Sequence, residues 1–410
     1  MNKLNMGKGY TYEYAKRNFF RAMKKDTASM YAYNNLQYKD QKSLIRELPS
    51  MHRIYFYIPE PLPKSYFSFF VKVLYVPNEM MKGLGCLVNQ LLPYRNEIYK
   101  YVSLKNNYEC HFLKGEYELC QVVLDEIDSI SLSLWSLEQR LQLAFKQGGS
   151  KKAMACKDEM AEKSSPLVKI LLQMIWAKVE ARFSLSPTEQ QLYLIIHESG
   201  FSDNFSAYFK YLILKYEADF NYEDCMWIAL MTSVLDIYDF SMDAVVYKTK
   251  TLEKEEMRQV RSMLSDLGKS IYDERITAVE KRLGFNKTPD ANEIRLNLLN
   301  KYHIGDYNYV YSRSIPYIID NPRDFDIVDV YVKAAVRLKK KKIQTGTINK
   351  NCFLWHIINC LFSYLSKDAS SEVSLGRLKV MANQMSSFKT GNCLSEKIKF
   401  YDHSDYTLET

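Results

Sequence analysis

The sequence predicts an all-α protein built mainly from antiparallel helix pairs, and three observations support this fold class. Glycine and proline are scarce, with 14 and 11 residues in a chain of 410, which leaves few tight turns to close β-hairpins. Apolar residues make up 47% of the chain, enough to fill a core. After Pro93, apolar residues recur at helical spacing between brief polar breaks.

Residues 1–93 predict a basic N-terminal region of less regular structure. Apolar and basic side chains separate onto two faces of residues 10–25, which predicts an amphipathic helix, and a second, charged helix is expected over residues 34–48. Prolines at positions 59, 61 and 63 then forbid a continuous helix. Two further elements are expected: a short strand or extended linker near residues 53–58, and an apolar helix or strand over residues 66–75.

Residues 94–400 predict a helical, repeat-like domain in which short breaks separate long amphipathic segments. The expected helices are, in chain order, 94–113, 117–130, 135–146, 151–163, 167–183, 188–197, 206–218, 222–236, 254–283, 291–302, 307–319, 325–340, 352–366 and 373–385. Residues 401–410 have no apolar period, which predicts a flexible tail.

The sequence contains no charge-free apolar run of the roughly 18 residues that a membrane span requires. Its N-terminus also lacks the succession of basic, apolar and small residues that marks a secretory signal. We therefore expect a cytoplasmic protein without a transmembrane segment. Its 8 cysteines are dispersed and form no C-x-x-C pair, so we expect reduced core residues rather than a zinc ribbon.

The positive charge of the chain is concentrated at its beginning. Residues 1–111 carry 17 Lys and Arg against 8 Asp and Glu, whereas the remainder carries 39 against 40. This asymmetry indicates an acidic partner for the N-terminal part, such as nucleic acid, an anionic membrane surface or an acidic protein. The alternative is an ordinary charged surface that keeps the protein in solution.

One pattern of turn residues occurs twice. The stretch "GDYNYVYSRSIPYIIDNP" at residues 305–322 places a glycine, an acid and a tyrosine before an apolar helical stripe and ends on proline, and "GEY" at residues 115–117 begins in the same way. Glycine allows a φ > 0 turn after the first helix, and the acid lies at the positive N-terminus of the second. Four tyrosines follow Gly305 in the longer stretch. We expect Tyr307 and Tyr317 to pack, and Tyr309 and Tyr311 to face solvent or a partner.

On these residues the chain resembles the tetratricopeptide repeat, a pair of antiparallel helices of about 34 residues. In that family the inter-helix turn reads Gly-Asp-Tyr and a proline closes the unit. The matching residues are Gly305, Asp306, Tyr307 and Pro322 in one unit and Gly115 and Tyr117 in the other, which Gly148 and Gly149 follow 33 and 34 residues after Gly115.

The match is incomplete, because Leu132 stands where the earlier unit should have its proline, and residues 164–300 contain no further clean match. The resemblance implies a right-handed α-solenoid whose concave groove binds a protein partner, and it implies no cofactor. An irregular helical domain is the alternative.

No set of residues predicts a catalytic or cofactor-binding site. The sequence has no P-loop, no G-x-S-x-G elbow and no H-E-x-x-H zinc motif, and "GLGC" at residues 83–86 lacks the third glycine of a dinucleotide-binding loop. These absences weigh against the common enzyme classes, so we predict neither catalytic residues nor a metal site.

Two clusters still require comparison with metal sites. Cys352, His356 and Cys360 lie on one stripe of a helix, but steps of about 6 Å between them are too long for one ion, so we expect a buried core face. The i, i+3, i+7 spacing of "DIYDFSMD" brings three acids together, which fits a solvated surface, a helix end or, alternatively, a metal-dependent nuclease. These acids are Asp236, Asp239 and Asp243.

Two basic clusters could contact phosphate groups or an acidic partner. The first accompanies Phe19 and Phe20 and consists of Lys16, Arg17, Arg21, Lys24 and Lys25. The second ends the helix predicted over residues 325–340, where cations also complement the helix dipole. It consists of Arg337, Lys339, Lys340, Lys341 and Lys342.

The sequence as a whole predicts a non-catalytic scaffold, adaptor or sensor subunit that binds a protein partner. A nucleic-acid-binding subunit, for example in bacterial antiviral defence, is the first alternative, and it depends on the basic N-terminal region. The divergent metal-dependent nuclease is the second alternative.

Overall fold

The computed structural model describes residues 38–47, 61–70, 80–181, 184–215, 222–229, 231–249, 252–268, 271, 273–282, 292–346, 348–367 and 369–403. Within these residues the protein is helical, and the β-type pairing consists of one isolated bridge between Tyr66 and Ser164. The predicted all-α class is therefore confirmed. The amphipathic helix predicted over residues 10–25 and the extended segment near residues 53–58 lie outside the described residues.

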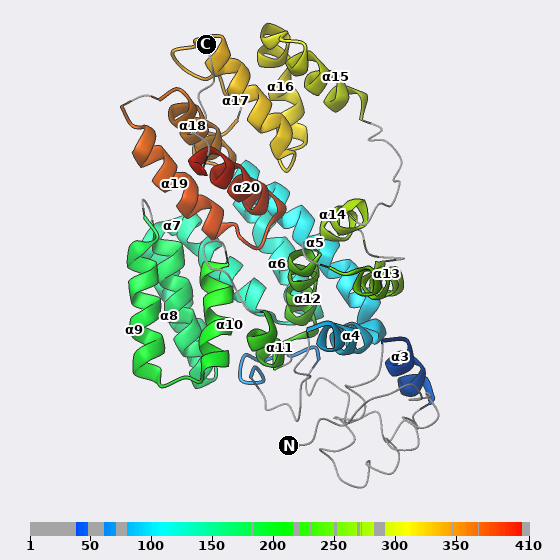
Figure 1. Ribbon diagram of the computed structural model, residues 1–410. Coiled ribbons are helices and arrows are strands. Elements are labelled where there is room, and N and C mark those ends of the chain that lie inside the picture. The colour runs from blue at the N-terminus through cyan, green and yellow to red at the C-terminus, as the bar shows by residue number, and fades with distance from the viewer. Residues whose placement is uncertain are drawn as a thin grey trace.

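The helices follow one another with short connections (Figure 1). Their bounds are α3 Tyr38–Glu47, α4 Met80–Leu91, η2 Leu92–Tyr94, α5 Arg95–Lys114, α6 Tyr117–Ile130, α7 Leu134–Glu162, α8 Pro166–Glu180, α9 Ser186–Ser199, α10 Asp203–Leu214, α11 Tyr222–Ala229, α12 Val234–Lys248, α13 Lys254–Gly268, α14 Glu274–Arg282, α15 Glu293–His303, α16 Tyr307–Asp320, α17 Phe325–Arg337, α18 Phe353–Leu365, α19 Ser371–Gln384 and α20 Lys389–His403. Among these helices, none is both long and apolar enough to cross a bilayer.

Two long predicted helices are each divided in the structure. The helix predicted over residues 222–236 ends at Ala229, and α12 begins after Ser233, whose side chain accepts a hydrogen bond from Asp236 N. The helix predicted over residues 254–283 is α13 followed by α14. In both cases the apolar period continues across the break, so the sequence pattern alone does not reveal it.

The helices α4 and α20 were not predicted, and of α12 only residues 234–236 fell within a predicted helix. In α20 the buried residues Leu394, Ile398 and Tyr401 lie at helical spacing, but the polar residues between them obscure the period. Because Tyr401 is buried and α20 continues to His403, the prediction of a tail that begins at residue 401 is wrong at its first residues.

The described part of the proline-rich segment, residues 61–70, is neither helix nor strand but a series of turns and bends. Its backbone contributes to helix starts elsewhere, because Pro63 O accepts a hydrogen bond from Leu132 N and Pro61 O accepts one from Val234 N, both at 2.9 Å. The helix or strand predicted from residue 66 is therefore absent over residues 66–70. Proline suits this role, since it leaves the carbonyl free while it prevents a local helix.

The helices share one hydrophobic core that extends from Tyr66 to Tyr401. Figure 1 shows α15, α16 and α17 at one end of the molecule and α7 to α10 as a group toward the other, with α5 and α6 running between them. Besides its neighbour α6, α5 contacts α12 and α18, and α8 contacts α19. Stacking of sequence neighbours therefore accounts for only part of the packing, and the predicted boundary at residue 93 does not divide this core.

The two predicted repeat turns have the same backbone conformation. Gly115 has φ +76° and Gly305 has φ +83°, and in each turn the N–H of the following acid donates to the carbonyl five residues earlier, at 2.9 Å. This pattern is the Schellman motif, which satisfies the free carbonyls at a helix end. The φ > 0 turns expected from the sequence are thus confirmed at both glycines.

The other residues of the repeat pattern have mixed outcomes. Gly148 and Gly149 interrupt α7, with Gly149 at φ +65°, and so separate the two helices predicted there. α16 ends just before Pro322, and Tyr317 is buried as expected. Tyr311 was expected to face solvent or a partner, but it is buried. Its ring stacks on Tyr331 with centroids 5.4 Å apart.

Candidate functional site

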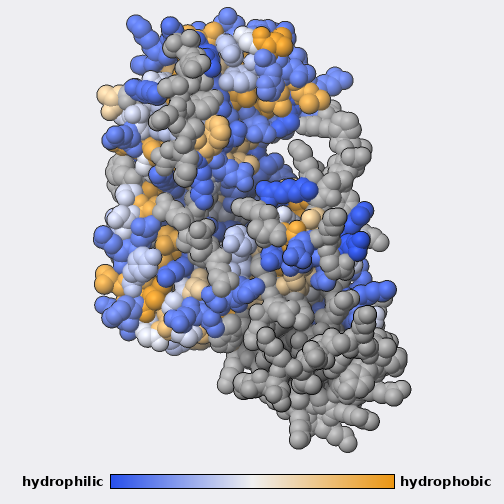
Figure 2. All heavy atoms as spheres, in the orientation of Figure 1, coloured by the Kyte–Doolittle hydropathy of each residue, from blue (hydrophilic) through white to orange (hydrophobic). Residues whose placement is uncertain are grey.

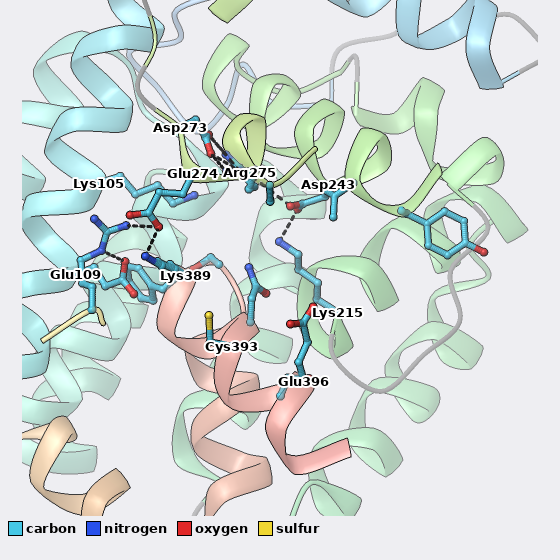
Figure 3. A pocket seen from close by; sticks show the side chains of 18 of the residues that line it. Lys105, Glu109, Lys215, Asp243, Asp273, Glu274, Arg275, Lys389, Cys393 and Glu396 are labelled. Atoms are coloured by element: carbon cyan, nitrogen blue, oxygen red, sulfur yellow. Dashed lines mark hydrogen bonds and ion pairs between the residues drawn. The ribbon is translucent and has the colours of Figure 1, made fainter. Parts of the chain in front are cut away.

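A charged cavity of about 450 Å³ opens near the middle of the molecule, between α5, α12, α14 and α20. Seven basic and five acidic side chains line it, together with an aromatic group at one end. Figure 3 shows these side chains converging from helices that are far apart in the sequence. On the face shown in Figure 2 hydrophilic residues predominate, and hydrophobic residues occur only in small separate groups.

Asp239 of α12 lies at the centre of the buried charges. Its carboxylate accepts hydrogen bonds from Tyr101 Oη and Lys105 Nζ, both at 2.6 Å, and from Arg275 Nη2 at 2.7 Å. Burial alone would raise the pKa of Asp239, but the two cations outweigh it and hold the pKa well below its usual range. Burial lowers the pKa of Lys105, and Asp239 opposes that effect. The result is an ion pair within a network rather than an isolated buried charge.

Arg275 joins three aspartates in this network. Its guanidinium contacts Asp273 at 2.8 Å and Asp243 at 3.2 Å in addition to Asp239. Burial would lower the pKa of Arg275, but the three carboxylates outweigh burial and raise it. Asp243 also pairs with Lys215 and accepts a hydrogen bond from Tyr211 Oη at 2.7 Å. These contacts tie α5, α10, α12 and α14 together.

A second charged group joins α5 to the start of α20. Glu109 accepts hydrogen bonds from Arg323 Nε at 2.6 Å and from Thr390 N at 2.8 Å. Glu274 pairs with Lys389 at 3.0 Å and lies 3.6 Å from Arg323. Figure 3 shows Lys389 between Glu109 and Glu274. Because Glu109 meets a free N–H of the first turn of α20, it acts there as a capping anion.

In three of these pairs the cation is nearer to solvent than its carboxylate. The side chain of Lys215 is 16% exposed against 7% for Asp243, Arg275 is 20% exposed against 7% for Asp273, and Arg323 is 17% exposed against 2% for Glu109. In each pair the carboxylate lies deeper in the protein than the cation, so the ion pair orients the cation toward the cavity.

The remaining aspartate of α12, Asp236, has a different environment. It accepts hydrogen bonds from Leu134 N at 2.9 Å, Trp135 N at 3.2 Å and Ser233 Oγ at 2.7 Å, all neutral donors. Burial raises its pKa to about 6, because these donors offset the loss of hydration only in part. Asp236 thus supports the first turn of α7 and takes no part in the ion network.

The structure corrects the interpretation of the three aspartates as a solvated surface, a helix end or a metal site. Asp236 and Asp243 are buried and Asp239 is mostly buried, and their carboxylates face tyrosine hydroxyls, backbone N–H groups and the cations described above. Among the described residues, no cluster of three or more His, Cys, Asp or Glu side chains could hold a metal ion. The geometry therefore gives the nuclease alternative no support.

The cysteine and histidine cluster is only partly a core face. Cys352 and Cys360 are buried, as predicted, but His356 is exposed. Cys352 has a local role, since its Sγ accepts a hydrogen bond from Trp355 N at 3.3 Å and so caps α18.

Of the two basic clusters, the second lies within the described residues. The N-terminal cluster, from Lys16 to Lys25, lies outside the described residues. In the other cluster, α17 ends at Arg337, Lys339 has φ +53°, and Lys340 lies over the Tyr311 ring at 5.1 Å. Lys341 and Lys342 are exposed. This second cluster does not line the cavity.

Sequence reasoning missed the basic residues of the cavity because they come from several helices and connections that are far apart in the sequence. Lys105, Lys215, Arg275, Arg323 and Lys389 have no common motif in the sequence. One signal was available: three acids occur on α12, whose other residues are largely apolar. Buried acids require cationic partners, so this helix could have been identified as part of a buried ion network, although not its partners.

The fold and the cavity define an all-α protein of helical hairpins with a charged central site. Comparison of the chain with protein-family models, with curated proteins and with solved structures finds no match.

Proposed function

We propose that the protein is a non-catalytic scaffold that binds a partner protein through the outer face of the α5–α6 hairpin. The shared turn geometry at Gly115 and Gly305 supports the relation to helical-hairpin repeats, which bind other proteins through extended surfaces. The site itself is defined by exposed apolar residues on α5 and α6.

A single observation carries the proposal. Leu119 and Val122, one turn apart on α6, are 47% and 54% exposed, and Tyr99 on α5 is 49% exposed. A groove of about 330 Å³ runs between the two helices and is lined by Tyr99, Leu104 and Ile130 among others, whereas Leu119 and Val122 are not part of its lining. Exposed apolar groups beside a groove mark interaction sites more often than do scattered single residues.

The surroundings of this face indicate the chemistry of the partner. Four exposed acidic residues accompany the apolar pair on α6, namely Glu116, Glu118, Asp125 and Glu126. The complementary surface is an amphipathic helix with apolar residues one turn apart and basic residues beside them, because charges of opposite sign around an apolar centre favour encounter and fix orientation.

The test is site-specific photo-crosslinking from position 122 in the native host, followed by affinity capture of the crosslinked partner with a second chain that carries the double variant Leu119→Lys/Val122→Lys. Both positions are exposed, so we expect stability to change by no more than about 0.5 kcal/mol and the crosslinked partner to be lost. The matched control is Tyr193→Lys/Leu194→Lys on α9, where the side chains are 56% and 61% exposed.

We expect the α9 variant to retain the crosslinked partner. The proposal fails if position 122 yields no specific crosslink, or if the partner is retained equally well by the α6 variant and the α9 variant.

A further inference from the structure

The end of the cavity next to α12 combines cations with an aromatic pair. Tyr222 and Tyr247 line it, with ring centroids 5.0 Å apart. Lys215 is held there by Asp243, one turn before Tyr247 on α12. The guanidinium of Arg282 reaches the same turn, where it donates to Val246 O at 3.4 Å.

The ion pairs of the wall leave Arg282 as the cation at this end for which the described residues provide no carboxylate partner. Arg275, Lys105 and Lys215 are balanced by the three acids Asp239, Asp243 and Asp273, whereas within the described part of the chain Arg282 makes only its contact with Val246 O. An arginine side chain has five N–H donors in a planar fork that matches the oxygens of a phosphate. Arg282 therefore has donors to offer to an anion in the cavity.

The aromatic pair adds a different kind of contact. Tyr247 is 42% exposed, and Tyr222 is nearly buried beneath it. An exposed ring supported by a buried ring offers a rigid face on which a planar group can stack. The volume of about 450 Å³ lies within the range of small-molecule sites.

We propose that this cavity binds a small phosphate-bearing molecule with a planar ring, a mononucleotide in chemical class. Arg282 and Lys215 contact the phosphate, and the ring packs on Tyr247. Binding requires no bond to form or break. The inference does not rest on the α5–α6 face, so either proposal can fail without the other.

The experiment is isothermal titration calorimetry of the full chain at low salt with adenosine monophosphate, ribose 5-phosphate, inorganic phosphate and adenosine. We expect adenosine monophosphate to bind most tightly and the affinity to fall with added salt, because the contacts are charged. Arg282→Ala removes no partner of a buried acid and should weaken binding of adenosine monophosphate about tenfold or more. The matched control is Arg313→Ala, at an exposed position of α16.

Tyr247→Ala tests the ring. It should weaken binding of adenosine monophosphate about 3- to 10-fold and leave ribose 5-phosphate unchanged, whereas the control Tyr193→Ala on α9 should change neither. The phosphate site is overturned if no phosphate-bearing probe binds at millimolar concentration, or if Arg282→Ala binds as tightly as Arg313→Ala. The ring contact is overturned if ribose 5-phosphate binds as tightly as adenosine monophosphate.

Discussion

The α5–α6 and α15–α16 hairpins close with the same turn but occupy different positions in the fold. In both turns a positive-φ glycine is followed by an acid and a tyrosine, and the acid pairs with a basic residue four positions before the glycine: His111 with Glu116 at 2.6 Å and Lys301 with Asp306 at 3.2 Å. The tyrosine ring packs on the aromatic residue three positions before the glycine. Local sequence therefore fixes the turn in the same way twice.

Beyond the turn, the two hairpins differ in how much of their first helix is buried. Eight residues of α5 are buried, and α5 contacts α12 and α18 besides α6. In α15 only Leu298 is buried among the residues described, and its apolar Ile294 is 62% exposed. The same turn residues therefore do not predict how strongly packing against the rest of the protein stabilises a helix pair.

The largest expected difference concerns the aromatic residue before each turn. Phe112 is fully buried and packs among Tyr108, Phe353 and Phe388, whereas the matching Tyr302 is only partly buried. We expect Phe112→Ala to lower the free energy of unfolding by about 3–5 kcal/mol and Tyr302→Ala by about 1–2 kcal/mol. Urea denaturation of the two variants measures both values. Equal losses would contradict the difference in burial.

The next difference concerns the cation ten positions before each glycine. Lys105 pairs with Asp239, which also binds Arg275, and the matching Arg295 pairs with Asp324 at 2.8 Å in a somewhat more exposed position. Asp239→Asn should cost about 3–5 kcal/mol near neutral pH, because it leaves buried cations without their charge partner, and Asp324→Asn about 1 kcal/mol.

The effect of pH on Asp239→Asn has a definite sign. Because the folded-state pKa of Asp239 is lowered, its ionised form contributes stability above the unfolded pKa of about 3.9, and this contribution is lost as pH falls through that value toward the folded pKa. The difference in unfolding free energy between wild type and variant should therefore shrink below about pH 4. A difference that stays constant down to strongly acidic pH would contradict the ion-pair assignment.

The smallest expected difference lies at the glycines themselves. An added Cβ at Gly305 would meet no atom within 4 Å, whereas at Gly115 it would lie 3.0 Å from Cys352 Cβ. Gly305→Ala should cost about 1–2 kcal/mol for its positive φ alone, and Gly115→Ala about 1 kcal/mol more for the contact with α18. Thermal unfolding of the two variants makes the comparison, and a larger loss at Gly305 would reverse it.

Much of the fold follows from local patterns in the sequence. The helix predicted over residues 117–130 coincides with α6, the one predicted over residues 94–113 differs from α5 by one residue at each end, and the one predicted over residues 307–319 is one residue shorter than α16. Prediction failed where an apolar period continues across a break, as between α11 and α12, or where polar residues interrupt the period, as in α20. A side-chain cap such as Ser233 acts locally but resembles many serines that cap nothing.

The site was less predictable than the fold. The turn residues Gly115 and Gly305 were identifiable because a positive φ restricts the residue type at one position. The cavity was not, because Lys105, Lys215 and Arg275 acquire their roles only beside acids that are far away in the sequence.

The sequence by itself determined the all-α class, the limits of most helices and the two glycine turns, since these depend on helical periodicity and backbone sterics within a few residues. Only the tertiary structure decided which hairpin is central, what the three aspartates of α12 contact, and where the charged cavity lies. The physical reason is that helical spacing places residues on a face, whereas the burial and pKa of a charge depend on what packs against that face.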